Sequence, residues 1–331
     1  MSYPTLPRVQ VVCFLAAAGL LAVLGSGARV NSAFQKQAPQ RTRLDPAKVL
    51  GEKACQECHK SEIAAWKKSS HATKSFALLT QNDKAKDIAA KADVAPGDLT
   101  TKSLCLDCHA ATGSHAAGAD AVVGNSCETC HGVAGPKDGG WIAIHNDYGG
   151  KDVKREQETE DHYRKRAADC DKLGMRRSAK LYDLAKNCYV CHTVSNEKVI
   201  AAGHPAGKPE FEFTHWLGGE VRHNFQQDQA VNAEAPTLWT DPHVGEKKTV
   251  AGRKRLSIVM GQLVDLEVSL RNRASAQGRD FAEHARKRIL QAKERLEQID
   301  GAVDIPAVKK TLELMGKVRS IRLRRISATD G

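Results

Sequence analysis

One five-residue pattern, Cys-x-x-Cys-His, occurs four times in the chain and takes up eight of its ten cysteines. Two cysteines with this spacing can each form a thioether with a vinyl group of one haem, and the histidine that follows then binds the iron from one side. Zinc also binds paired Cys-x-x-Cys units, but it gives no reason for a histidine after every second cysteine. The pattern therefore predicts four covalently bound c-type haems. The expected thioether cysteines and proximal histidines are Cys55, Cys58 and His59; Cys105, Cys108 and His109; Cys127, Cys130 and His131; and Cys188, Cys191 and His192.

Each iron has a second axial position, and nine of the thirteen histidines lie outside the four motifs. A second histidine makes a low-spin iron suited to electron transfer, whereas an empty position leaves the iron open to small ligands. In a chain with four irons, histidines near the motifs are expected to be ligands. The expected distal ligands are His71, His145, His204 and His223. His115 and His215 are further candidates, and His284, among Arg and Lys residues, is expected to be solvated.

The composition indicates what kind of fold holds these residues. The chain has 331 residues, of which 41% are hydrophobic and only 5% aromatic. This aromatic content is thin for a conventional core of that size, and four large apolar haems would supply the missing core. The formal net charge of +11 would be offset by about two propionates per haem. We therefore predict a mainly α fold with long loops, organised around four haems over residues 50–244.

A different pattern follows the last motif. Apolar residues recur every three or four positions over 256–270, over 281–299 and again over 308–318, which is the period of one helix face. Pro306 marks the start of the third of these helices. The sequence therefore predicts a C-terminal helical hairpin or bundle over residues 245–325.

The N-terminus has the features of an export signal. Arg8 precedes an apolar run from Val9 to Leu24, and small residues follow up to Ala28. We expect residues 1–28 to be a signal peptide, although an apolar run of this kind could instead be kept as a membrane anchor. Residues 29–49 are polar and are expected to be a flexible linker. A protein of this kind would act in the periplasm, where c-type haems are attached.

Positive charge is concentrated at the other end of the chain. Residues 245–331 contain 20 Lys and Arg residues against 11 Asp and Glu residues, so they carry +9 of the total +11. This region is either an ordinary solvated surface or a docking surface for an acidic redox partner or an anionic membrane surface. Nucleic acid is not an expected partner, because the compartment excludes it. Cys170 lies outside the motifs and is either a partly buried thiol or a cross-link or extra ligand.

The order and spacing of the motifs carry a resemblance to a known family. The first motif, Cys55–His59, is followed by Ala65-Trp66-Lys67 and Ser70-His71-Ala72, and the third lies in the sequence from Gly124 to Gly132. With these features, residues 50–225 resemble the tetrahaem cytochrome c-554 family. The resemblance implies near-parallel stacked pairs of haems and a role in passing electrons from hydroxylamine oxidation toward the quinone pool.

The resemblance also implies a set of axial ligands. His71 would bind the third haem, His145 the fourth, and a histidine near position 223 the first. In that family the second haem is five-coordinate and high-spin. This chain has extra histidines, and His204 could fill the open site.

Three functions follow from these features. The first is a periplasmic tetrahaem cytochrome that transfers electrons between redox proteins through stacked haems, in which the protein supplies axial ligands, burial and spacing. The second is an enzyme that reduces a small nitrogen oxide at an open haem. The third is a haem subunit of a larger membrane-bound redox complex, held through the basic C-terminal helices. An electron carrier is favoured over an enzyme, because no motif has lysine in place of the proximal histidine.

Overall fold

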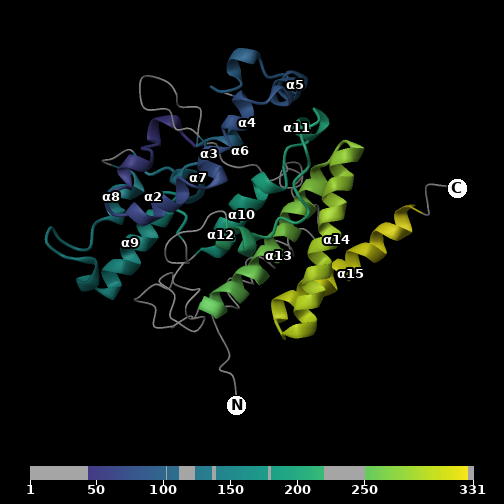
Figure 1. Cartoon of the computed structure of the whole chain (residues 1–331). Helices are drawn as coiled ribbons and strands as arrows, with labels where there is room; N and C mark the ends of the chain where they lie inside the picture. Colours follow the sequence, from purple (N-terminus) through teal and green to yellow (C-terminus); the bar gives the residue numbers. More distant parts are fainter. Residues whose placement is uncertain are drawn as a thin grey trace. The chain divides into compact units, whose positions relative to one another are not determined.

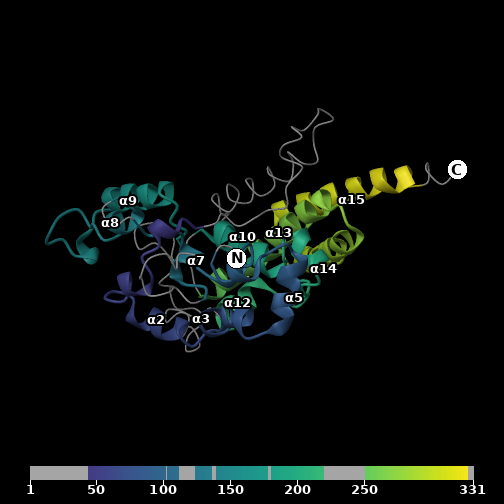
Figure 2. The same ribbon diagram turned by 90° about the horizontal axis from the view of Figure 1, so that it is seen from above.

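The structure is a computed structural model that describes residues 44–101, 103–111, 124–135, 139–177, 180–219 and 250–326. Throughout these ranges every regular element is a helix, as predicted for a mainly α protein (Figures 1 and 2). The chain forms two compact units by its contacts, one within Gln40–Ile258 and the other containing Val259–Gly331. All four Cys-x-x-Cys-His motifs belong to the first unit.

Short helices joined by loops make up the first unit. Six of them carry or adjoin residues of the predicted haem site: α2, α3, α6, α7, α8 and α10. The helices are α2 (Lys60–Trp66), α3 (Ser70–Thr73), α4 (Ala77–Thr80), α5 (Asp83–Lys91), α6 (Leu106–His109), α7 (Cys127–His131), α8 (Trp141–His145), α9 (Glu160–Lys172), α10 (Leu181–His192), α11 (Glu197–Ala201) and α12 (Phe213–Gly219). Four 3-10 turns lie among them at Pro46–Lys48, Glu52–Ala54, Pro96–Asp98 and Arg155–Gln157.

The segment from the first motif to His71 is divided into two short helices. Helix α2 ends at Trp66, and α3 begins anew because the Ser69 side chain accepts a hydrogen bond from the amide of Ala72, which caps the new helix. The loop that leads into the third motif crosses this cap closely. A Cβ at Gly124 would lie 2.6 Å from the carbonyl oxygen of His71, and its φ of +86° is one that glycine adopts easily. The break thus lets another part of the chain approach the backbone of His71.

Small apolar clusters, rather than one large core, hold the helices of this unit. Leu106, inside the second motif, is only 1% exposed and packs with Leu79 of α4, Ala89 of α5 and Leu99. Helices α8 and α9 lie side by side, as both views show. This arrangement agrees with the thin aromatic content noted in the sequence.

Three long helices follow, as the periodicity predicted. They are α13 (Val250–Ser275), α14 (Arg279–Ala302) and α15 (Pro306–Ile326). In the second unit, Leu263 and Leu266 of α13, Leu296 of α14 and Val308 of α15 form one apolar cluster. Asp265 and Arg288 form a buried ion pair between α13 and α14, with 2.6 Å from Nε to Oδ1.

Several sequence predictions fall outside the described residues, namely the signal peptide or anchor over 1–28, most of the linker over 29–49, and His115 and His223. The described end of the linker is packed rather than free, because the carbonyl oxygen of Lys48 accepts a hydrogen bond from the amide of Gly135 at 2.9 Å. His284 is half-buried on α14 instead of solvated. No helix in the described ranges is long and apolar enough to cross a membrane.

Candidate haem-binding site

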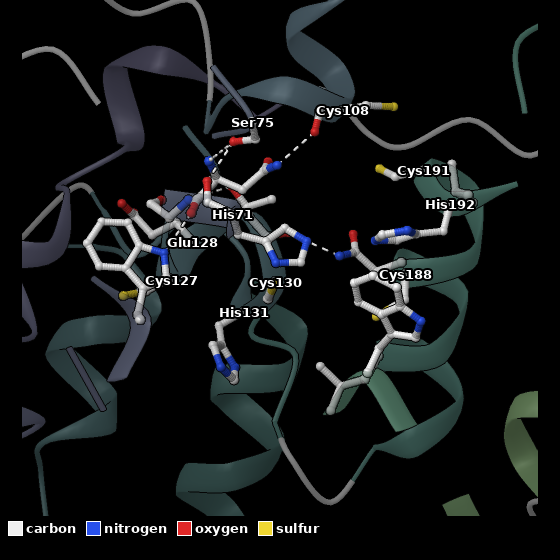
Figure 3. Close-up of a pocket in the computed structure, with 18 of the residues that line it drawn as sticks. His71, Ser75, Cys108, Cys127, Glu128, Cys130, His131, Cys188, Cys191 and His192 are labelled. Atoms are coloured by element: carbon white, nitrogen blue, oxygen red, sulfur yellow. Dashed lines mark hydrogen bonds between the residues drawn. The ribbon is translucent and has the colours of Figure 1, made fainter. Parts of the chain in front are cut away.

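A cavity of about 1620 Å³ lies within the first unit. Its wall includes all eight motif cysteines, all four motif histidines, and three of the predicted distal histidines: His71, His145 and His204. Figure 3 shows part of this cavity, with residues of the second, third and fourth motifs and His71 around one space. A single drug-sized ligand needs about 300–1000 Å³, so this cavity is large enough for more than one such group. The four motifs, spread over 138 residues of sequence, therefore meet at one place.

Local helical structure aims three of the four motifs at this cavity, and the first motif forms a turn just before α2. Helices α6, α7 and α10 each end at the histidine of a motif, and α2 begins directly after His59. In a helical turn, residues three and four positions apart share a face. The first cysteine, the second cysteine and the histidine of a motif therefore project to the same side, which is what two thioethers and one iron ligand on a single haem require.

Two proximal histidines are oriented by backbone carbonyls. Nδ1 of His109 donates to the carbonyl oxygen of Ser75 at 2.7 Å, and Nδ1 of His131 donates to that of Arg176 at 2.8 Å. Because a carbonyl can only accept, the ring proton lies on Nδ1 and leaves the Nε2 lone pair for a metal. Histidines that bind metals commonly make this second hydrogen bond, which fixes the tautomer and the ring direction.

Three motif histidines each face a histidine from elsewhere in the chain. The ring centres are 6.3 Å apart for His59 and His145, 5.9 Å for His71 and His192, and 6.2 Å for His109 and His204. Two imidazoles that bind one metal ion from opposite sides are separated by about 6.4 Å, from about 2 Å per metal–nitrogen bond and about 1.2 Å from each nitrogen to its ring centre. All three gaps therefore fit one iron.

These pairings differ from those that the family resemblance implied. His71 faces the histidine of the fourth motif instead of the third, and His145 faces that of the first instead of the fourth. His204 lies opposite His109 of the second motif, the position at which the resemblance implied an open iron. His215, by contrast, is exposed on α12. The pairing depends on how distant loops fold, and sequence spacing does not encode it.

Burial keeps two of the ligand candidates, His145 and His109, neutral. It lowers the pKa of His145 to about 4, with a further contribution from the positive charge of Arg166, and it also lowers the pKa of His109. A histidine must be deprotonated to bind a metal. Arg166 in turn donates to the carbonyl oxygen of His145 at 2.8 Å and forms a buried ion pair with Glu158. Arg166 was not singled out from the sequence, because its role depends on the contact between α8 and α9.

The motif cysteines are also neighbours of one another. Cys55 and Cys127 lie close enough for each to shift the pKa of the other thiol, that of Cys55 downward and that of Cys127 upward, so the first and third motifs adjoin. Cys130 lies close enough to Cys188 to raise the pKa of its thiol, after the larger effect of burial, so the third and fourth motifs also adjoin. Cys191 of the fourth motif lies 3.9 Å from the carbonyl oxygen of Asp107 in the second. No disulfide joins the nine cysteines that the structure describes.

The third motif is tied to the other three through hydrogen bonds. The indole Nε1 of Trp66, just after the first motif, donates to the carbonyl oxygen of Asn125 at 2.7 Å. The side chain of Asn125 donates to the carbonyl oxygen of Cys108 in the second motif, also at 2.7 Å. Asn187, beside the fourth motif, donates to the carbonyl oxygen of Thr129 at 3.2 Å. The third motif is thus the centre of this polar network.

Two further features bear on the alternatives that the sequence left open for Cys170 and on zinc as an alternative to haem. Cys170 is a buried thiol with Sγ 3.7 Å from the carbonyl oxygen of Trp141, and burial raises its pKa. The buried thiol that the sequence allowed is therefore confirmed. Among the described residues, no three side chains of His, Cys, Asp or Glu converge in a way that could hold a zinc ion.

Comparison with known proteins gives one match. Residues 54–132 match a family model described as cytochrome c554 and c-prime. No curated protein and no solved structure matches the chain. The matched segment contains the first three motifs and therefore confirms the resemblance seen in the sequence. It groups residues 54–132 with the c554-type cytochromes, whose c-type haem is bound covalently.

Proposed function

We propose that this chain is a periplasmic tetrahaem c-type cytochrome that carries electrons between redox proteins. One observation supports this proposal most strongly: three motif histidines each face a second histidine at the separation of two axial ligands. Bound haem would supply one-electron chemistry at the iron, and the protein supplies its surroundings. The residues that would hold the four haems are the eight motif cysteines and four motif histidines, with His71, His145 and His204 as distal ligands and His223 as the expected fourth.

The chain's own residues suit a carrier. Two histidines on one iron favour a low-spin centre, which changes little in structure when its charge changes. Carbonyl hydrogen bonds orient His109 and His131, and burial holds His145 neutral. The apolar wall of the cavity would exclude water from the haem faces. Each of these effects stabilises a fixed centre instead of preparing a substrate site.

The contacts between motifs support one order for electron movement. The first motif adjoins the third through the hydrogen bond from Trp66 to Asn125, and the third adjoins the fourth through the hydrogen bond from Asn187 to Thr129. The fourth then approaches the second through Cys191. We propose that electrons pass in the order first, third, fourth and second haem, or the reverse. The first motif is the most exposed of the four, so one end of this route lies at the surface.

The alternative of a nitrogen-oxide reductase requires an open iron. The second haem is the open one in the related family, but here His204 lies opposite His109. A low-spin second haem would have no position for a small substrate. The geometry therefore favours the carrier.

Electron paramagnetic resonance of the oxidised holoprotein tests the proposal, together with a haem count from the pyridine haemochrome spectrum. We expect four haems per chain and only low-spin signals. Fewer than four haems would contradict the tetrahaem proposal. A high-spin signal that integrates to a whole haem would contradict the carrier and favour small-ligand chemistry.

A further inference from the structure

Glu128 is a buried acidic residue in the third motif, between Cys127 and the second cysteine. It is only 1% exposed, and acidic side chains are rarely buried to this degree unless they have partners. The haem chemistry of the motif does not require this residue, since the two positions between the cysteines bind neither haem nor iron. Its burial therefore calls for a separate explanation.

Three backbone amides donate to the Glu128 carboxylate. The amide of Leu50 lies 3.1 Å from both oxygens, that of Gly51 lies 2.8 Å from Oε2, and that of Ala134 lies 2.8 Å from Oε1. All three partners are donors, and an ionised carboxylate has only acceptor sites to offer them. Hydrogen bonds to a charged group are about twice as strong as neutral ones. The side chain is thus held at both oxygens.

The donors come from two separate segments of the chain. Leu50 and Gly51 directly precede the turn Glu52–Ala54, which leads into the first motif, and Ala134 follows the third motif. Gly51 has a φ of +78°, so the chain turns at this point into Cys55. The carboxylate therefore connects the segment that carries the first haem to the segment that carries the third.

Neighbouring contacts strengthen the same junction. The amide of Gly135 donates to the carbonyl oxygen of Lys48 at 2.9 Å, and Leu50 packs against Ala134 and Trp141. Cys55 follows the turn after Gly51, and Cys127 directly precedes Glu128 in the chain. Two covalent attachment points are thereby fixed relative to each other, with a buried negative charge beside them.

We propose that Glu128 is the positioning residue that fixes the first haem against the third and lowers the reduction potentials of this pair. The inference rests on the proposed function, since it assumes that both motifs bind haem. A buried negative charge favours the ferric state, which carries one more positive charge than the ferrous state. The same carboxylate thus sets both the spacing of the pair and its readiness to give up an electron.

The test compares Glu128→Gln with Glu57→Gln in the full-length holoprotein. Glu57 is the acidic residue between the two cysteines of the first motif, one position later than Glu128 in the third, and it is exposed, so its variant removes the same charge from a motif without removing a junction. The amide that replaces the carboxylate has one acceptor oxygen, so it cannot serve all three backbone donors. Glu128→Asp keeps the charge on a shorter side chain and serves as the conservative variant.

Two readouts follow. Hydrogen exchange at the amides of Leu50, Gly51 and Ala134 is expected to be at least tenfold faster in Glu128→Gln than in the wild type or in Glu57→Gln. Spectroelectrochemical titration is expected to show at least a threefold higher ratio of ferrous to ferric haem for one pair at fixed potential, which is about 30 mV at 59 mV per tenfold change. Glu128→Asp should lie between Glu128→Gln and the wild type in both.

The inference is overturned if Glu128→Gln and Glu57→Gln give the same amide exchange and the same titration curves. If Glu128→Gln is not recovered with four haems, Glu128→Asp is measured in its place. The inference is then overturned if the three amides of Glu128→Asp exchange at the wild-type rate. A wild-type protein with fewer than four haems would instead refute the proposed function. The exchange measurement keeps the two failures apart, because it reports on the junction directly.

Discussion

Removal of the imidazole at position 204 is the sharpest perturbation of the proposed haem site. The ring centres of His109 and His204 are 6.2 Å apart, within about 0.2 Å of the separation of about 6.4 Å for two axial imidazoles. His204 thus needs almost no movement to bind an iron held by His109. In His204→Ala the second iron would lose one axial ligand, and the other three would keep theirs.

The expected result is a change in one haem of four. The oxidised His204→Ala protein should show a high-spin signal that integrates to about a quarter of the total iron. It should also bind about one equivalent of carbon monoxide when reduced, whereas the wild type should bind almost none. A ligand tethered by a short flexible segment acts at an effective concentration of the order of 1 mM. External imidazole at about 10–100 mM should therefore return the variant to a low-spin spectrum.

His215→Ala is the matched control, because His215 lies eleven positions further along the chain and is exposed. Its spectrum should stay low-spin and its affinity for carbon monoxide should not change. A wholly low-spin His204→Ala protein would refute the assignment of His204 to the second haem. A high-spin signal in the control would show that any change in this segment disturbs the iron.

Three further predictions concern the surroundings of the site. Arg166→Met should lower the free energy of unfolding by about 3–5 kcal/mol, because it leaves the Glu158 carboxylate buried without its guanidinium partner. Urea titrations measure this loss, and a loss below about 1 kcal/mol would contradict the prediction. Burial is the largest single effect and raises the pKa of Glu158, but the hydrogen bonds and positive charges of Arg166 and His162 together outweigh it and leave the pKa below the ordinary 4.5. The pair should therefore stabilise the fold above about pH 4.5 and lose its effect as the pH falls further, a dependence that Arg166→Met should weaken in acid titrations followed by circular dichroism. Gly207→Ala would place a Cβ 1.8 Å from the carbonyl oxygen of His192. We therefore expect the free energy of unfolding to fall by about 1–3 kcal/mol and a low-spin signal in the electron paramagnetic resonance spectrum to shift. The control Gly97→Ala, with nothing within 4 Å of the new Cβ, should leave both the stability and the spectrum unchanged.

The sequence predicts the parts of this site that depend on local spacing. Each of the four motifs is a run of five residues, and the three C-terminal helices follow from an apolar repeat of three or four positions. The histidines that line the cavity were predicted from their nearness to the motifs. Helices α13 and α14, for example, were predicted from apolar residues three and four positions apart, because this period is a property of one helix face.

What the sequence could not predict depends on contacts between distant segments. The pairing of His71 with His192 joins residues far apart in the chain, and nothing in either local sequence selects the other. Glu128 likewise resembles any variable residue inside a motif until its three amide donors are known. The break before α3 also depends on the chain's path, because Ser69 caps the new helix only where the backbone turns before it.

The paired histidines also impose an order on maturation. Under the proposed export from the N-terminus, His59 would emerge well before His145, so an iron held at the first motif would have to wait for 86 more residues before its second ligand arrives. For the fourth motif the order is reversed, because the distal ligand candidate His71 precedes the motif histidine His192 by 121 residues in the chain. Contacts this far apart in sequence are slow to form, because a long loop must close first. The wait is longer still for the second haem, since His204 follows His109 by 95 residues, and a truncated chain that ends before position 204 would leave that haem open to solvent and to reactive small molecules.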